Sequence, residues 1–145
     1  MKSSKTIVLT GFLLFSLLSY SQQASEIDAL FNKVLLFYQT NNIDHKTHNR
    51  QLSFNKDLRI LKIDSMQIAF DEVEIKYEFF KNENRSEHIV FFSCIGHKSC
   101  IKSNNKNSKG IIGYGTEFKD ESDCKEFINL ISDLKKSLPN KTLLK

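Results

Sequence analysis

The chain contains two segments with a helical spacing of apolar residues, separated by a region in which apolar and polar residues alternate. Over Ser25–Thr40, apolar residues recur every three or four positions, which predicts an amphipathic helix with one buried face. The same spacing over Asp120–Leu138 predicts a second helix. The first helix is followed by the polar stretch Asn41–Asn49, which we expect to be a linker.

The middle of the chain reads as a series of short strands. Alternation is clearest over Val73–Phe79, where one face is apolar and the other charged, as in an antiparallel strand with one wet face. The expected strands are Leu52–Phe54, Leu58–Ile63, Met66–Phe70, Val73–Phe79, His88–Ile95 and Ile111–Phe118. The pattern therefore predicts an α+β fold: an antiparallel barrel or sandwich of about six or seven strands, closed by a C-terminal amphipathic helix, with an added N-terminal helix.

The N-terminus has the three parts of a secretory signal. Lys2 and Lys5 precede the apolar run Ile7–Leu18, and the small residues of Ser19–Ser21 then predict cleavage before Gln22. The run is shorter than the ~20 apolar residues that a spanning helix needs, and we expect no membrane-integral segment after cleavage. The sequence predicts a bacterial protein exported to the periplasm or the extracellular space.

Removal of residues 1–21 from the 145-residue chain leaves 124, the size of one domain. We divide it into an N-terminal helix and linker (22–49), a β domain with its C-terminal helix (50–139) and a flexible tail (140–145). With 19 basic and 17 acidic residues, this mature chain has too small a charge imbalance to indicate nucleic-acid binding.

The β domain resembles the pleckstrin-homology-like (PH-like) barrel found in small secreted bacterial proteins. The resemblance covers Leu52–Leu138 and rests on the successive strands, on the central apolar strand Ile89–Ile95 and on the C-terminal helix. Three apolar residues of that helix would close the barrel by packing on Val90 or Phe92: Phe127, Ile131 and Leu134. The resemblance implies a scaffold that binds peptides, proteins or lipid headgroups rather than one that carries out a reaction.

A close cysteine pair is the clearest candidate for a specific site. Cys94 and Cys100 are six positions apart, and such a pair in an exported chain predicts a disulfide. We expect Cys124, on the apolar face of the second helix, to be a buried free thiol, although a bridge from it to either of the other two stays open. The alternative is a zinc site formed by Cys94, His97 and Cys100, with Cys124 or His88 as fourth ligand.

A basic, Asn-rich segment, Lys98–Lys109, follows this pair. It contains no acidic residue, and its lysines could together contact an anionic surface. The alternative is a solvated loop with no partner. The four residues are Lys98, Lys102, Lys106 and Lys109.

The sequence contains no recognisable catalytic motif, such as G-x-S-x-G or H-E-x-x-H. We therefore predict an exported, non-enzymatic binding or interaction module without a cofactor, whose partner is a protein, a peptide or another envelope component. The alternatives are a small secreted enzyme whose site is assembled from dispersed residues and a Cys/His zinc-binding protein. A deep pocket with convergent titratable groups would favour an enzyme, and a shallow groove or exposed sheet edge would favour binding.

Overall fold

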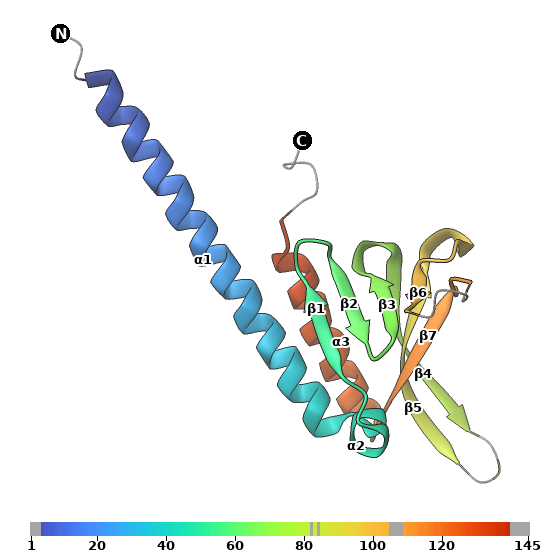
Figure 1. The fold of residues 1–145 in the computed structure, drawn as a ribbon. Helices are drawn as coiled ribbons and strands as arrows, with labels where there is room; N and C mark the ends of the chain where they lie inside the picture. Colours follow the sequence, from blue (N-terminus) through green and yellow to red (C-terminus); the bar gives the residue numbers. More distant parts are fainter. Residues whose placement is uncertain (1–3, 82, 84, 105–108, 140–145) are drawn as a thin grey trace.

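The structure, a computed structural model, describes residues 4–81, 83, 85–104 and 109–139; for residues 4–21 and His97 it describes the backbone alone. Three α-helices and seven strands form the described part of the chain (Figure 1). The helices are α1 (Ser4–Asn41), α2 (Ile43–His48) and α3 (Glu121–Ser137). The strands are β1 (Leu52–Asn55), β2 (Ile60–Ile63), β3 (Met66–Ala69), β4 (Val73–Lys81), β5 (Ser86–Cys94), β6 (Ile101–Ser103) and β7 (Gly113–Phe118).

The strands form two antiparallel sheets, one with the order β1-β2-β3-β6 and the other with the order β4-β5-β7. The sheets meet at a single antiparallel bridge between Ile101 in β6 and Ile111 just before β7. The α+β class is confirmed, but the described strands form no closed barrel. Because β6 has three residues, pairing between the sheets ends after this bridge instead of continuing around a barrel.

The first helix is longer than its apolar stripe predicts. It runs without a break from Ser4 to Asn41, so the expectation that it begins at Ser25 is wrong. No Pro or Gly separates the apolar run from the amphipathic stripe, so nothing in the local sequence forces a new start. Its C-terminal part packs against α3, and in Figure 1 its N-terminal part extends beyond the strands.

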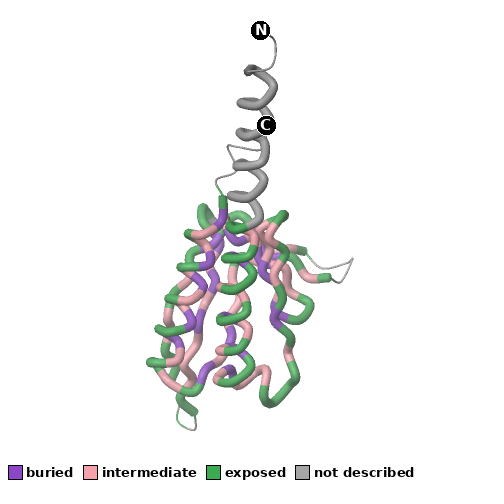
Figure 2. The backbone as a smooth tube through the Cα atoms, turned by 90° about the vertical axis from the view of Figure 1, so that its left-hand side faces the viewer, coloured by how far each residue is buried: buried purple, intermediate pink, exposed green. Residues whose placement is uncertain are grey.

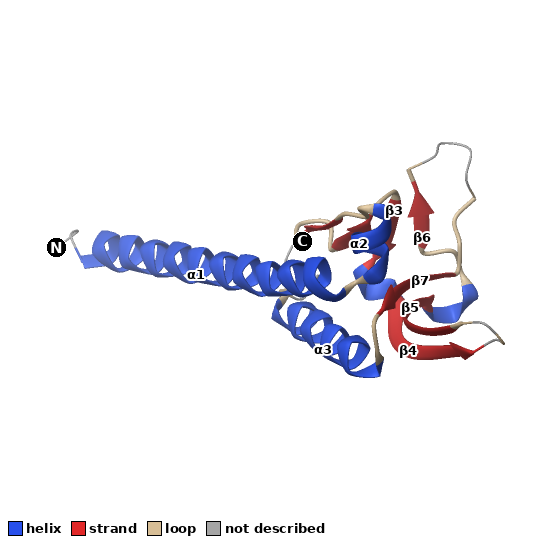
Figure 3. Ribbon diagram, turned by 90° about the horizontal axis from the view of Figure 1, so that it is seen from below, coloured by secondary structure: helices blue, strands red, loops and turns tan. Residues whose placement is uncertain are grey.

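A single core lies between the helices and the sheets (Figures 2 and 3). Phe127, Ile131 and Leu134 of α3 are fully buried and belong to the same core as Val90 and Phe92 of β5, as expected. The α1 helix adds a second layer that the strand pattern did not anticipate: its aromatic residues contact α3 and the end of β7. This aromatic cluster comprises Phe37, Tyr38, Phe118 and Phe127.

Two short elements lie where we expected irregular structure. The supposed linker Asn41–Asn49 contains α2, and the supposed basic loop Lys98–Lys109 contains β6. With six residues in α2 and three in β6, both elements are too short to repeat an apolar period several times. Neither carries the run of apolar residues from which helices and strands are inferred.

Candidate binding groove

An open groove of about 610 Å³ lies between α2 and the outer face of the β5–β7 pair. Its floor is apolar and includes the backbone of Gly115, while charged side chains form most of its rim. The lining residues are Ile43, Asp44, Thr47, His48, Arg50, Arg85, Glu87, Ile89, Gly115 and Glu117.

Asn42 holds α2 against β7. Its side-chain oxygen caps the helix by accepting a hydrogen bond from the backbone of His45 at 2.8 Å, a common role for asparagine. Its amide nitrogen donates to the Thr116 hydroxyl at 2.8 Å and to the Glu117 carbonyl at 2.7 Å. Asn42 and Thr116 are 0% and 1% exposed, so these bonds satisfy polar groups that have lost contact with water.

Asp44, in the first turn of α2, continues this connection. Its Oδ2 accepts hydrogen bonds from the backbone N–H of Glu117 at 3.0 Å and from the Thr116 hydroxyl at 3.2 Å. Its other oxygen, Oδ1, lies 3.4 Å from Nη1 of Arg50. Asn42 and Asp44 therefore bond both backbone groups of Glu117, as a neighbouring strand would.

Arg50 extends the network to Tyr114 of β7. Its Nη1 donates to the Tyr114 hydroxyl at 3.3 Å. Burial lowers the pKa of Arg50, but Tyr114 and Asp44 beside it raise the pKa above its ordinary value, so the guanidinium stays charged. For Tyr114, burial raises the pKa, so its hydroxyl stays protonated. Arg50 thus supplies a permanent positive charge to the lining of the groove.

An ion-pair cluster of Arg85, Glu87 and Glu117 also lines the groove. Arg85 lies 3.0 Å from Glu87 and 2.5 Å from Glu117, and it precedes the first residue of β5. Because Arg85 is more than half exposed, these pairs orient the rim and contribute little to stability.

The floor depends on a glycine. A Cβ at Gly115 would lie 2.8 Å from Cγ2 of Ile89, which shows that the Ile89 side chain lies directly over the β7 backbone. Together with Ile43, this side chain makes the groove apolar at its base.

Behind the groove, the phenol of Tyr38 is fully buried, and its hydroxyl makes no hydrogen bond with any described residue. Burial raises the pKa of Tyr38 well above its ordinary value, with the negative charge of Asp44 adding to the effect. The hydroxyl is therefore a neutral donor at every physiological pH.

The titratable groups of the groove are not arranged as a catalytic triad. Nδ1 of His48 lies 2.7 Å from the Thr47 hydroxyl and 3.9 Å from Asp44 Oδ1. A triad needs the nucleophile and the carboxylate on different ring nitrogens, whereas here the same nitrogen faces both groups. The Thr47 hydroxyl already donates to the Ile43 carbonyl at 2.8 Å. The arrangement suits binding through hydrogen bonds and charge.

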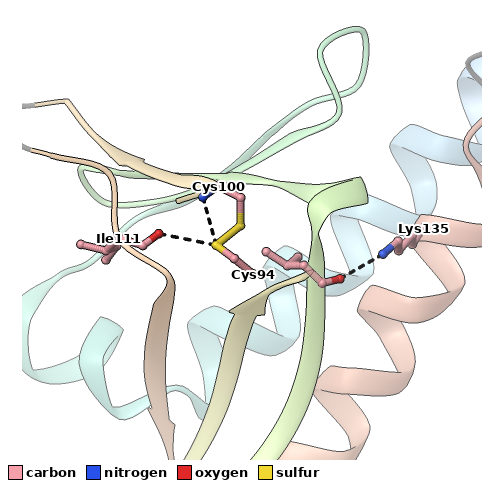
Figure 4. The surroundings of a disulfide bond; sticks show 5 residues. Cys94, Cys100, Ile111 and Lys135 are labelled. Carbon is pink, nitrogen blue, oxygen red and sulfur yellow. Dashed lines mark hydrogen bonds between the residues drawn. A yellow bond between two sulfur atoms is a disulfide. The ribbon is translucent and has the colours of Figure 1, made fainter. Parts of the chain in front are cut away.

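The cysteine pair lies away from this groove. Cys94, at the end of β5, and Cys100, just before β6, form a disulfide with 2.08 Å between the sulfur atoms (Figure 4). Sγ of Cys94 also accepts a hydrogen bond from the backbone N–H of Cys100 at 3.1 Å. The bond joins the two sheets close to the Ile101–Ile111 bridge.

The residues of the zinc alternative do not come together in the described part of the protein. Cys94 and Cys100 are bonded to each other, and Cys124 is a free thiol on the buried face of α3. The side chain of His97 lies outside the described residues, and His88 contacts the Tyr77 hydroxyl at 2.9 Å. Among the described residues, no three His, Cys, Asp or Glu side chains converge as metal ligands would.

The basic segment is divided by β6. Lys98, Lys102 and Lys109 are exposed, and Lys102 is opposite Gln67 in the ladder between β3 and β6. Lys106 falls outside the described residues, as does the expected tail, 140–145. The structure thus places three of the four lysines at the surface.

Sequence reasoning missed the residues that build the groove. Asn42 followed by an acidic residue two positions later is the usual start of a helix, and this signal could have identified α2. By contrast, nothing in the sequence indicates that Arg85, Glu87 and Glu117 face that helix, because the relation depends on strand pairing.

No known family model, curated protein or solved structure matches the chain. No helix in the described part of the chain is long and apolar enough to cross a bilayer. The fold and the groove therefore define the class of protein only as a small α+β domain with a disulfide and an open, charged groove.

Proposed function

We propose that the protein is an exported binding module whose groove accepts an extended peptide alongside β7. The observation that carries this proposal is the backbone of Gly115, which faces the groove at an unpaired stretch of sheet edge. Extended peptides bind at such edges by adding a strand, with main-chain hydrogen bonds supplying affinity.

The direction of the Gly115 backbone follows from its neighbours in β7. Both backbone groups of Glu117 point away from β5, toward Asn42 and Asp44, and Ile111 exchanges both of its hydrogen bonds with Ile101. Because backbone direction alternates along a strand, Gly113 and Gly115 between them also point away from β5. Among the described residues, no hydrogen bond occupies these outward groups of Gly115.

The groove suits a short peptide better than a small substrate. It is open along its length, and Ile43 and Ile89 can accept one apolar side chain at its base. Arg50 and the cluster of Arg85, Glu87 and Glu117 offer charged contacts of both signs. This combination of apolar floor and polar rim is typical of a recognition surface.

Export is supported by the signal-like N-terminus and by the Cys94–Cys100 disulfide, since structural disulfides persist in oxidising compartments. We place the protein in the periplasm or outside the cell. The resemblance to PH-like domains stays a prediction, supported by antiparallel strands followed by a helix that packs on them. An anion-contacting role for Lys98, Lys102, Lys106 and Lys109 also stays a prediction.

A displayed library of random peptides tests the proposal. Peptides selected on the wild-type protein should bind Gly115→Ala with similar affinity but lose at least tenfold with Gly115→Pro, which removes the outward N–H. Both variants add a Cβ under Ile89, so the alanine variant is a matched control for packing. Circular dichroism establishes that each variant is folded.

A second measurement is independent of the proline variant. Adding a selected peptide to the 15N-labelled wild-type protein should shift the amide signals of Gly113, Gly115 and Glu117 most strongly. Failure to select any peptide, or shifts centred on another surface, would overturn the proposal.

A further inference from the structure

The strand β4 lies at the other edge of the same sheet, which has the order β4-β5-β7. It has nine residues, Val73–Lys81, and pairs with β5 along its whole length. In Figure 3, β4 is the outermost strand of its sheet, and its C-terminal half continues past the end of α3. Long exposed edges are places where another chain can pair.

The outer edge of β4, the side away from β5, is capped at its beginning. The Val73 carbonyl accepts a hydrogen bond from Nζ of Lys135 on α3 at 3.3 Å (Figure 4). Because backbone direction alternates, Ile75, Tyr77 and Phe79 also present their N–H and C=O groups to this edge. Among the described residues, no hydrogen bond is made to the backbone of these three residues on that side. Their N–H and C=O groups therefore remain available for pairing with another strand.

The side chains of β4 differ between its two faces. The face toward α3 carries Ile75, Tyr77 and Phe79, and exposure increases along the strand until Phe79 is 48% exposed. The opposite face carries Glu74, Lys76 and Glu78, which alternate in sign, and then the half-exposed Phe80. Within the strand, Lys76 lies 2.7 Å from Glu74. A partner strand must therefore match an apolar row on one face and an alternating charge row on the other.

We propose that β4 pairs with β4 of a second copy of this chain, antiparallel and centred on Tyr77. Tyr77 is the midpoint of the nine-residue strand, and this register pairs the open outward groups of Ile75, Tyr77 and Phe79 with those of the second copy. It places Lys76 opposite Glu78 of the second copy, and two-fold symmetry makes this ion pair twice. Oppositely charged residues directly across two strands stabilise the pairing.

The same charges exclude the neighbouring registers. Centring the pair on Lys76 places Lys76 opposite its own copy and Glu74 opposite Glu78. Centring it on Glu78 places Glu78 opposite its own copy. Both arrangements bring like charges together, which destabilises strand pairing. The charge row is therefore self-complementary in the Tyr77 register.

The apolar face agrees with the Tyr77 register. Phe79 lies opposite Ile75 of the second copy, and the two tyrosines meet at the symmetry axis. The half-exposed Phe79 ring then gains an apolar neighbour, and the two sheets combine into one of six strands with the order β7-β5-β4-β4-β5-β7. An isologous contact of this kind closes at two copies and leaves no repeating edge.

Sedimentation equilibrium of the purified protein, expressed from the full sequence, tests the pairing. The wild type should self-associate into dimers, and Lys76→Glu should raise the dissociation constant about tenfold or more because both ion pairs become repulsive. The double variant Lys76→Glu/Glu78→Lys restores opposite charges in this register and should recover the dimer. Lys98→Glu, the same charge change at an exposed position outside β4, should leave the dimer unchanged.

The rescue by charge exchange separates a specific register from a general effect of charge or folding. A wild-type protein that stays monomeric at all concentrations would overturn the pairing. So would a dimer that Lys76→Glu does not weaken or that the double variant fails to restore. None of these outcomes depends on peptide binding at Gly115, so the two proposals succeed or fail separately.

Discussion

The carboxylate of Asp44 accepts a hydrogen bond from the backbone N–H of Glu117 at 3.0 Å, across 73 positions of sequence. A six-residue helix thereby substitutes for a strand at the end of β7. The contacts from α2 end at Glu117. Gly115 is the next residue of β7 whose N–H and C=O groups point away from β5, and these groups face the groove. The contact decides both where the sheet edge is closed and where it is open.

We expect Asp44→Ala to expose this edge. The change removes the acceptor of the Glu117 N–H and of the Thr116 hydroxyl, so the free energy of unfolding should fall by about 1–3 kcal/mol. The Glu117 amide should also exchange with deuterium faster, which NMR measures directly. Asp57→Ala, at an exposed turn, is the control and should change stability by less than about 0.5 kcal/mol.

Phe127 is fully buried, and its ring centroid lies 4.8 Å from that of Phe118. Phe127→Ala leaves a cavity among α1, α3 and β7, and we expect it to lower the free energy of unfolding by about 3–5 kcal/mol. Urea denaturation followed by circular dichroism checks this. Leu36→Ala, on the exposed face of α1, should have little effect. Equal stability of the Phe127 variant and the wild type would contradict the packing described here.

The disulfide joins cysteines six positions apart and closes a short loop. On the chain-entropy model, replacing both Cys94 and Cys100 by alanine should lower the free energy of unfolding by about 2 kcal/mol. The domain should still fold, because a chain of this length can form its own core. Peptide mapping without reductant should find these two residues linked and Cys124 free. Stoichiometric zinc, together with destabilisation by a chelator, would instead indicate a metal site.

Burial raises the pKa of Cys124 to about 12, with nearby acidic side chains adding to the shift. The thiol should therefore resist alkylation by iodoacetamide at pH 8 until the protein unfolds, because the thiolate is the reactive form.

The raised pKa of Cys124 also determines how the free energy of unfolding changes with pH. Between about pH 9 and pH 12 the unfolded chain loses this proton and the folded chain keeps it, so the contribution of Cys124 to stability falls as pH rises. Labelling followed by mass spectrometry measures the first effect, and pH-dependent unfolding of the wild type and Cys124→Ala measures the second.

Export makes a prediction about the N-terminus. Mass spectrometry of the protein recovered from the envelope or medium should find a chain that begins at Gln22 or a near neighbour. Recovery of the intact chain, beginning with Met1, from a membrane fraction would contradict cleavage.

Where the apolar pattern was long, sequence reasoning predicted the fold well. The stripe Asp120–Leu138 corresponds to α3, and the alternation over Val73–Phe79 corresponds to β4, because burial of one face imposes a period on the residues themselves. The elements without such a period were missed. The α2 helix is capped by Asn42 and held by contacts to a distant strand, and β6 takes its position from its partner β3.

The sequence by itself determined the α+β class, the positions of α3 and most strands, and a core that includes Phe127, Ile131 and Leu134. It also determined the charge row of β4, since strand geometry places Glu74, Lys76 and Glu78 on one face. Only the tertiary structure decided that the strands divide into two sheets, that Asp44 bonds Glu117 and that the groove exists. The physical reason is that local patterns report which face of an element is buried, whereas partners far apart in the sequence meet only when the elements pack.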